Sequence, residues 1–320
     1  MRALLRSIAF VLPLFLALPA SAATYPSRTV KLIVPFGVGG PADIYARTIA
    51  QYLSQQTKES FVVEDRPGAG SIIGSLAVAH SAPDGYTLLV MSNTHTTNES
   101  LMPNKPFKLM RDFVPVATIN SSDLMMVVPT SLPVKSVKDF INLAKKEPGK
   151  LNFASSGYGT PYHMAAELFK TMAGINVVHV PYKASGDARN AVLSGQVQMM
   201  FDAVTTMSQL AKAGKVRALG TTGLKRSQLT PDLPTVAETV PGYESTIWIG
   251  VMAPKGTPKK IVDFLNTSIN KVIELPQVKA AWLKQGAVPM VKTPQQFDAF
   301  LRKDIAKWAK VVKFAKLKIH

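Results

Sequence analysis

The sequence predicts an α/β fold built as two hinged lobes. Three observations predict it: short apolar runs alternate with segments of helical periodicity, the alternation occurs in two successive sets, and a helical segment follows the second set. Such alternation is typical of parallel βαβ units with right-handed crossovers. The chain has 320 residues, 47% of them hydrophobic, which is enough to bury one or two cores.

The first set of elements precedes residue 130. Apolar runs predict strands at 30–36, 61–64, 86–91, 113–119 and 124–128, and helical periodicity predicts helices at 42–55 and 72–79.

The second set and the C-terminal segment follow the same reasoning. The expected strands are 151–154, 177–180, 197–201, 216–219 and one beginning at 247, and the expected helices are 136–146, 160–172, 187–193, 205–211, 259–273, 276–284 and 293–314. Because the second set is nested within the chain, we expect one lobe from 23–122 with 223–320 and an inserted lobe from 123–222. The hinge crossings are expected near 120–124 and 220–225.

The first 22 residues have the composition of a cleaved signal peptide. Arg2 and Arg6 form a basic segment, an apolar stretch covers 8–18, and Ala20-Ser21-Ala22 resembles a cleavage site. The apolar stretch is shorter than the roughly 18 to 20 residues that a membrane span needs. The sequence therefore predicts export to the periplasm, with a mature chain that begins near residue 23.

The net charge indicates which kinds of ligand the protein can attract, and the cysteine content indicates what stabilises its fold. The formal net charge is +17, and without Arg2 and Arg6 it is +15 (35 basic minus 20 acidic residues). No aromatic platform or recognition motif accompanies this charge, so we expect attraction of small anions and no nucleic-acid binding. Cysteine is absent, so stability must come from the core.

A glycine-rich loop follows the first expected strand, in the sequence V-P-F-G-V-G-G-P-A-D at 34–43. Gly37, Gly39 and Ala42 fit a relaxed dinucleotide fingerprint, and Glu64 stands where a ribose-binding acid would lie. Pro35, Phe36 and the Gly40-Pro41 pair depart from that fingerprint, and export unfolded disfavours a nicotinamide cofactor. We therefore expect no cofactor.

A second loop of the same kind, S-S-G-Y-G-T-P-Y-H at 155–163, lies in the inserted set. Both loops end in a proline at a helix start, where its missing N–H costs nothing. Helix N-termini carry free N–H groups and a partial positive charge, which favour anions. One such loop in each lobe predicts a small-anion site in the cleft between the lobes.

An ordered series of motifs resembles one protein family. The motifs are Pro35-Phe36-x-x-Gly39-Gly40-x-x-Asp43-x-x-x-Arg47, Arg66-Pro67-Gly68-Ala69-Gly70-x-x-x-Gly74, Pro83-Asp84-Gly85-Tyr86-Thr87-Leu88, Phe113-Val114-Pro115-Val116, Ser155-Ser156-Gly157-x-Gly159-Thr160-x-x-His163, Val180-Pro181-Tyr182-Lys183, Gly195-Gln196-Val197 and Ala253-Pro254-Lys255-Gly256-Thr257-Pro258. In this series the chain resembles the Bug family, the extracytoplasmic solute receptors of tripartite tricarboxylate transporters. The resemblance spans essentially the whole mature chain. It departs from the family pattern at Ser71, Ala184 and Asp187.

The resemblance implies a two-lobed periplasmic binding fold of type II, the Venus-flytrap kind. It implies a monomeric receptor, with no enzymatic activity, that delivers a small carboxylate to the membrane subunits of a transporter or to a sensor protein. It also implies that two loops hold the ligand carboxylate. The residues carried over for this role are Phe36, Gly39, Gly40, Ser155, Ser156, Gly157 and Thr160.

Other polar residues have two interpretations each. Ser92, Asn93 and Thr94 follow a strand and are expected to line the cleft, although a polar turn has the same composition. Asp202 is interpreted as a ligand hydrogen-bond acceptor or as the N-cap of the next helix.

Asp43 and His163 are expected to organise the two loops. Asp43 lies in a first helical turn, where a carboxylate is favourable but would repel a second anion. His163 and Glu167 have a spacing that can hold a metal, but no other histidine completes a site, so we expect none.

Two hypotheses from different classes remain. The first is a binding receptor for a small organic carboxylate. The alternative is an exported α/β enzyme that acts on a carboxylated substrate with Asp202 or His163 as base.

Overall fold

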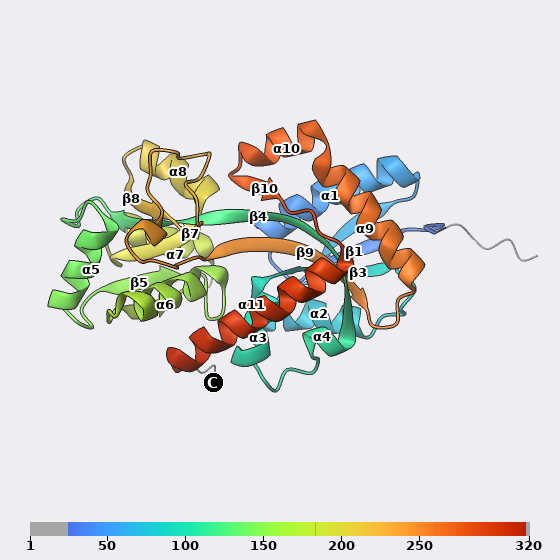
Figure 1. Ribbon diagram of the computed structural model, residues 1–320, viewed down its shortest axis with the longest axis horizontal. Helices are drawn as coiled ribbons and strands as arrows, with labels where there is room; N and C mark the ends of the chain where they lie inside the picture. The colour runs from blue at the N-terminus through green and yellow to red at the C-terminus, as the bar shows by residue number, and fades with distance from the viewer. Residues whose placement is uncertain (1–24, 183, 318–320) are drawn as a thin grey trace, which may run out of the picture.

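The computed structural model describes residues 25–182 and 184–317, so the expected signal peptide lies outside the described residues (Figure 1). The strands are β1 Val30–Val34, β2 Phe61–Asp65, β3 Thr87–Ser92, β4 Phe113–Pro129, β5 Asn152–Ser155, β6 Val178–Pro181, β7 Met199–Ala203, β8 Val216–Thr221, β9 Thr246–Pro254 and β10 Ala287–Pro289. The helices are α1 Pro41–Thr57, α2 Ile72–Ala79, α3 Asn93–Leu101, α4 Leu109–Asp112, α5 Val137–Lys146, α6 Pro161–Ala173, α7 Ser185–Leu193, α8 Val204–Lys212, α9 Lys259–Glu274, α10 Pro276–Leu283 and α11 Pro294–Phe314, with short 3-10 turns at Ala69–Ser71 and Val236–Glu238.

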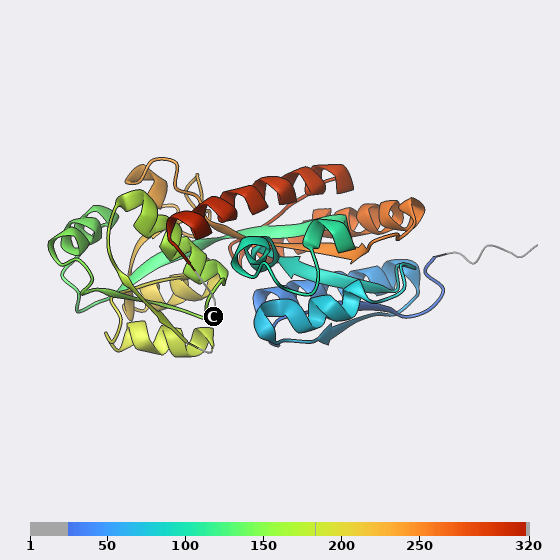
Figure 2. The ribbon, with the colours of Figure 1, turned by 90° about the horizontal axis from the view of Figure 1, so that it is seen from below.

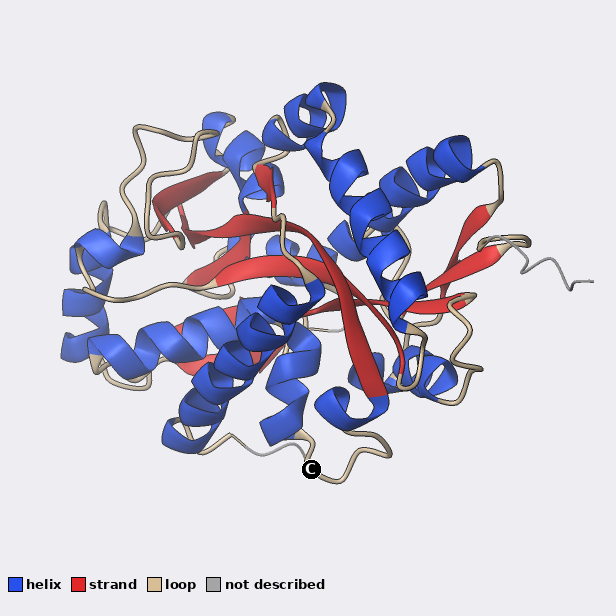
Figure 3. Ribbon diagram, turned by 45° about the vertical axis from the view of Figure 1, so that its right-hand side comes forward, coloured by secondary structure: helices blue, strands red, loops and turns tan. Residues whose placement is uncertain are grey.

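The strands form one mixed sheet in the order β2-β1-β3-β9-β4-β7-β5-β6, and β8 and β10 also pair with β4. β1 is parallel to β2 and β3, and β5 is parallel to β6 and β7, whereas β4 and β9 are antiparallel to their neighbours. Helices cover both faces of the sheet (Figure 3). The predicted α/β class, with two parallel βα sets, is confirmed.

β4 is one strand of 17 residues, and this corrects the expectation of two separate strands. The polar run Asn120-Ser121-Ser122-Asp123 interrupts the apolar pattern, but its backbone is paired with β9 and β10. From Leu124 onward the partners of β4 are β7 and β8. β4 therefore belongs to both parallel sets, and Figure 1 shows it running between them.

α3 is a helix that sequence periodicity does not predict, because its nine residues, N-T-H-T-T-N-E-S-L, are mostly weak helix formers. A capping box between Ser92 and His95 begins the helix. The Thr96 hydroxyl donates to Asp304 of α11 at 2.6 Å, so tertiary contacts support a segment of low intrinsic propensity.

α11 packs against both parallel sets of elements. It contacts α3 in the first set and α6 in the second, and Figure 2 shows it lying along the long axis of the molecule. The buried Trp308 and the carboxylate of Asp304 anchor it. None of the helices in residues 25–182 and 184–317 is long and apolar enough to span a membrane.

Candidate functional site

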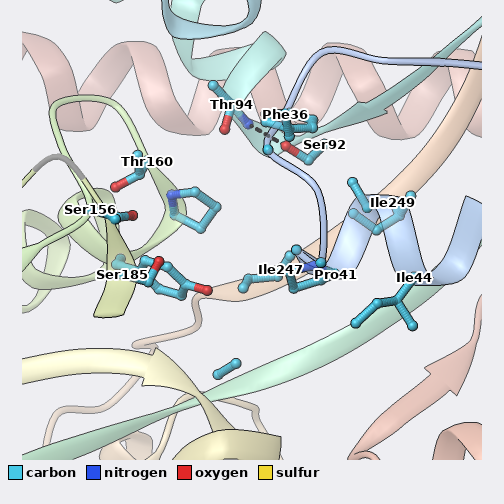
Figure 4. A pocket seen from close by; sticks show the side chains of 18 of the residues that line it. Phe36, Pro41, Ile44, Ser92, Thr94, Ser156, Thr160, Ser185, Ile247 and Ile249 are labelled. Carbon is cyan, nitrogen blue, oxygen red and sulfur yellow. Dashed lines mark hydrogen bonds between the residues drawn. The ribbon is translucent and has the colours of Figure 1, made fainter. Parts of the chain in front are cut away.

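A cavity of about 680 Å3 lies where the two parallel sets meet, and both glycine loops form part of its wall. Figure 4 shows Ser156, Thr160 and Ser185 on one side of the cavity and Pro41 and Ile44 on the other. Residues from the first set, the second set and β9 line it together. The two loops that the sequence singled out are therefore brought together by the fold.

Six helices direct their N-termini at this cavity. In each, the N-cap residue or a residue of the first turn is part of the wall; these are Gly40 and Pro41 of α1, Ser71 of α2, Ser92 and Thr94 of α3, Thr160 and Pro161 of α6, Ala184 and Ser185 of α7, and Ala203 and Thr205 of α8. Each N-terminus carries free N–H groups and a partial positive charge of roughly half a unit. The wall is therefore electropositive through its backbone.

This convergence follows from the sheet. Parallel strands place their carboxyl ends at one edge, and the helix after each strand begins there. The trio β1, β2 and β3 leads into α1, α2 and α3, and the trio β5, β6 and β7 leads into α6, α7 and α8. Because the two edges face the same cavity, six junctions contribute to one site.

The first glycine loop presents backbone rather than side chains. α1 has Gly40 as its N-cap and no side-chain cap, and the N–H groups of Ala42 and Asp43 find no acceptor among the described residues. Gly39 has a φ of +76°, which favours glycine, and a Cβ at Gly37 or Gly39 would meet no atom within 4 Å. The backbone N–H groups of this loop are therefore accessible from the cavity, as the binding of an anion requires.

Asp43 is hydrogen-bonded to this loop from the first turn of α1. The residue is 2% exposed, and its Oδ2 accepts a hydrogen bond from the Gly39 N–H at 2.8 Å. Arg47 contacts its Oδ1 at 2.5 Å. The carboxylate is thus held below the loop and is absent from the cavity wall.

The second loop is held by side chains. Thr160 caps α6 by accepting from the His163 N–H at 3.4 Å, and its hydroxyl donates to the Gly157 carbonyl at 2.8 Å. The Gly159 N–H donates to His163 Nδ1 at 3.1 Å. His163 is thus hydrogen-bonded to the loop through both its backbone and its ring, and Ser156 faces the cavity (Figure 4).

Two stacked histidines support this loop from behind. The rings of His163 and His179 lie 4.1 Å apart, and Tyr158 of the cavity wall packs edge-on against both. Burial lowers the pKa of His163 to about 2 and that of His179 to about 4, and the positive charge of Lys170 adds to both shifts. Both rings are neutral at neutral pH, which suits a structural role.

Seven of the predicted ligand-binding residues lie on the cavity wall: Phe36, Gly39, Gly40, Ser92, Thr94, Ser156 and Thr160. The other four, Asn93, Ser155, Gly157 and Asp202, are absent from the wall, and each has an internal hydrogen-bond partner. Asn93 donates to the Thr246 carbonyl at 3.2 Å. Ser155 Oγ lies 2.7 Å from His179 Nε2 and accepts from the Gly157 N–H at 3.1 Å.

Asp202 is placed differently from both interpretations of the sequence. It is fully buried, its Oδ2 lies 2.5 Å from Arg189 Nε, and its Oδ1 accepts from the Ala203 N–H at 2.7 Å. Burial raises the pKa of Asp202, and the adjacent guanidinium opposes that shift. The side chain neither reaches the cavity nor caps α8, whose N-cap is Ala203.

Several wall residues were missed by sequence reasoning: Ile44, Tyr45, Tyr158, Tyr162, Ser185, Arg189, Thr205, Thr206, Ile247, Ile249 and Gln285. Ser185 and Thr205 lie at strand-to-helix junctions, so the junction rule applied to every βα unit would have found them. Ile247 and Ile249 come from β9, which is remote in sequence. No local sequence pattern indicates that these two isoleucines line the cavity.

Neither Glu64, the candidate ribose-binding acid, nor the His163–Glu167 pair forms part of a cofactor or metal site among the described residues. Glu64 forms ion pairs with Arg66 and Lys31 at 2.5 and 3.4 Å and is absent from the cavity wall. His163 Nε2 lies 3.8 Å from Glu167, which pairs with Lys170. Within the described ranges, no group of three or more His, Cys, Asp or Glu side chains is arranged to hold a metal ion.

Comparison with known proteins finds relatives that match most of this chain. Residues 45–317 match the family described as "Tripartite tricarboxylate transporter family receptor". The chain is 38% identical to Protein BugT of Bordetella pertussis over 307 residues, which cover 95% of this chain and 94% of BugT.

Two solved structures are similar over nearly their full length. R. palustris Rpa4515 with adipate is 36% identical, with a TM-score of 0.84, over 92% of this chain and 99% of that one. MatC from Rhodopseudomonas palustris with bound malate is 29% identical, with a TM-score of 0.80, over 90% and 100%. The chain thus belongs to the family of receptors of tripartite tricarboxylate transporters, and within it to the Bug type.

Proposed function

We propose that this protein captures a small organic carboxylate in the cavity and delivers it to the membrane subunits of a tripartite tricarboxylate transporter. The observation that carries the proposal is the convergence of six helix N-termini on a wall whose described residues include no acidic side chain. Such a wall stabilises an anion through N–H groups and dipoles without requiring a lysine or arginine at the contact. The relatives with bound adipate and malate agree with this chemistry.

The two glycine loops are proposed to hold the carboxylate between them. The first offers the exposed N–H groups near Gly40, and the second offers the Ser156 hydroxyl. Ser92 and Thr94 add polar atoms from α3, while Phe36 covers the first loop. The apolar surface of Ile247 and Ile249 would then contact the hydrocarbon part of the ligand.

A hinged, two-lobed mode of capture belongs to the same proposal. The switch of β4 partners between Asp123 and Leu124 supports a boundary there, with residues 123–222 as the inserted lobe. The wall of the cavity draws on both lobes, so closure would bury the ligand. Export to the periplasm, monomeric action and contact with transporter subunits or a sensor complete the proposal, in keeping with the family.

The enzyme alternative gains no support from the described residues. Asp202 is fully buried against Arg189, and His163 already accepts a hydrogen bond at Nδ1. The lowered pKa of His163, about 2, also makes it a weak base.

Native mass spectrometry of the purified protein, followed by a melting screen with carboxylates, tests the proposed function. We expect a retained organic acid, or a rise in melting temperature with some carboxylates, because a ligand that binds only the native state stabilises it. The matching amides are the controls, since they keep the shape and remove the charge. Stabilisation by the amides alone would contradict the proposal.

A further inference from the structure

Arg189 is the single charged side chain among the described residues of the cavity wall. It lies on α7 one helical turn after Ser185, so the two share a face of the helix. About a quarter of its side chain, 26%, is exposed. It is therefore a cation that reaches the ligand cavity.

Asp202 holds this arginine in place. The carboxylate contacts Arg189 Nε at 2.5 Å and Nη2 at 3.3 Å, and its Oδ1 also accepts from the Ala203 N–H at 2.7 Å. Because Asp202 is fully buried on β7, it cannot follow the ligand, and it fixes the guanidinium from behind.

The guanidinium of Arg189 has N–H donors that the pairing with Asp202 does not use. An arginine carries five N–H donors, and the pairing with Asp202 uses only two of them. The negative partner is buried and the positive group is part of the wall, so the pair presents a positive end to the cavity. Planar, fixed N–H donors of this kind suit a carboxylate.

The place of Arg189 differs from that of the two glycine loops. The loops lie at the starts of α1 and α6, whereas Arg189 lies in the middle of α7, with Tyr162 of the wall beside the pair. Burial, followed by the charge of Asp202, raises the pKa of Tyr162, so the phenol stays neutral. A ligand held by both loops would therefore meet Arg189 with a different group.

We propose that Arg189, positioned by Asp202, binds a second anionic group of the ligand, so that the receptor prefers dicarboxylates to monocarboxylates of the same length. This inference rests on the proposed function. It assigns a specificity-determining role to one side chain, and it predicts that the preference disappears when the charged pair is made neutral.

The test is calorimetry with unbranched diacids of four to eight carbons and the monoacids of matching length. We expect the best diacid to bind the intact protein at least about tenfold more tightly than its monoacid, as a charge-assisted hydrogen bond provides. In the double variant Arg189→Gln with Asp202→Asn, the diacid should lose about 10- to 100-fold in affinity, and far more than the monoacid loses. The double substitution avoids leaving a buried charge without its partner.

The matched control is Arg226→Gln with Glu238→Gln, which neutralises a bidentate pair that is absent from the wall and should leave the ratio of affinities unchanged. If the first double variant does not fold, Arg189→Lys keeps the charge without the fork, and the ratio should fall several-fold. An intact protein without diacid preference, or variants that weaken diacid and monoacid equally, would overturn the inference. If no acid binds even the intact protein, the proposed function itself fails.

Discussion

The two glycine loops occupy matching places in the two parallel sets, yet they are built differently. The first loop has no side-chain cap on its helix and leaves backbone N–H groups open to the cavity. The second has a threonine cap, a histidine that accepts from the loop and two stacked histidine rings behind it. The first loop therefore offers the ligand its backbone, whereas the second offers side chains on a packed support.

This difference teaches that the same sequence signal, a strand, glycines, a proline and a helix, specifies position but not the donor atoms. We expect substitutions in the first loop to act on binding through steric exclusion. Those in the second should separate into effects on binding and effects on stability.

The largest effect is expected from Gly40→Leu. Gly40 has a φ of −76°, which any residue adopts, but an added Cβ would lie 3.2 Å from the Gly37 carbonyl oxygen, so that carbonyl must shift slightly. The longer side chain would enlarge the wall beside the open N–H groups. Carboxylate affinity should fall by more than about 100-fold, or about 3 kcal/mol. Calorimetry on Gly40→Leu checks this, with the exposed Gly186→Leu of α7 as the control. Retained affinity in a folded Gly40→Leu protein would remove the first loop from the anion site.

The neighbouring serines of the second loop should behave oppositely. Ser155→Ala removes the hydroxyl that contacts His179 and Gly157, so the free energy of unfolding should fall by about 2 kcal/mol. Ser156→Ala should leave the stability nearly unchanged and weaken carboxylate binding about tenfold, because Ser156 faces the cavity. Urea unfolding and calorimetry on both variants measure the two effects. If Ser155→Ala weakened binding and Ser156→Ala reduced stability, the second loop would have a different orientation from the one in this structure.

Replacement of Thr160 should reduce both the stability of the protein and its affinity for the ligand. Thr160→Val keeps the shape but removes the cap of α6 and the bond to the Gly157 carbonyl, so stability should fall by about 1 kcal/mol. Binding should weaken as well, because the loop loses its fixed form. Thr293→Val removes a similar cap from α11, away from the cavity, and should reduce stability alone. Equal binding losses in both variants would point to a general effect of unfolding.

The smallest effect concerns pH and a buried histidine in the first set. His95 occupies the third position of α3, as His163 does in α6, and burial lowers its pKa to about 4. A histidine with a depressed folded pKa is protonated first in the unfolded chain, so its contribution to stability is lost as the pH falls from about 6.5 towards about 4.

His95→Gln keeps a capping box and removes the titration. Between about pH 7 and about pH 5.5, the intact protein should lose about 1 kcal/mol more of its unfolding free energy than the variant does. Urea unfolding at both pH values measures the difference. Parallel losses in the two proteins would show that the pKa of His95 is the same in the folded and the unfolded chain.

The sequence predicted the parallel sets well because each of their elements is amphipathic or apolar at the right period. α2 matches its expected bounds, and α1, α5, α6 and α11 differ from theirs by one or two residues. α3 and the central part of β4 were not predicted, since neither carries a local hydrophobic pattern. α3 depends on contacts with α11, and β4 on pairing with β9 and β10.

The sequence by itself determined the α/β class, the two glycine loops, their expected preference for an anion and the family resemblance, because these depend on local order along the chain. The tertiary structure decided which polar side chains reach the cavity. It separated Ser155 from Ser156, buried Asp202 and brought Arg189, Ile247 and Ile249 to the wall. It also added four further helix N-termini to the two expected, because only the folded sheet places the carboxyl ends of both parallel trios around one space.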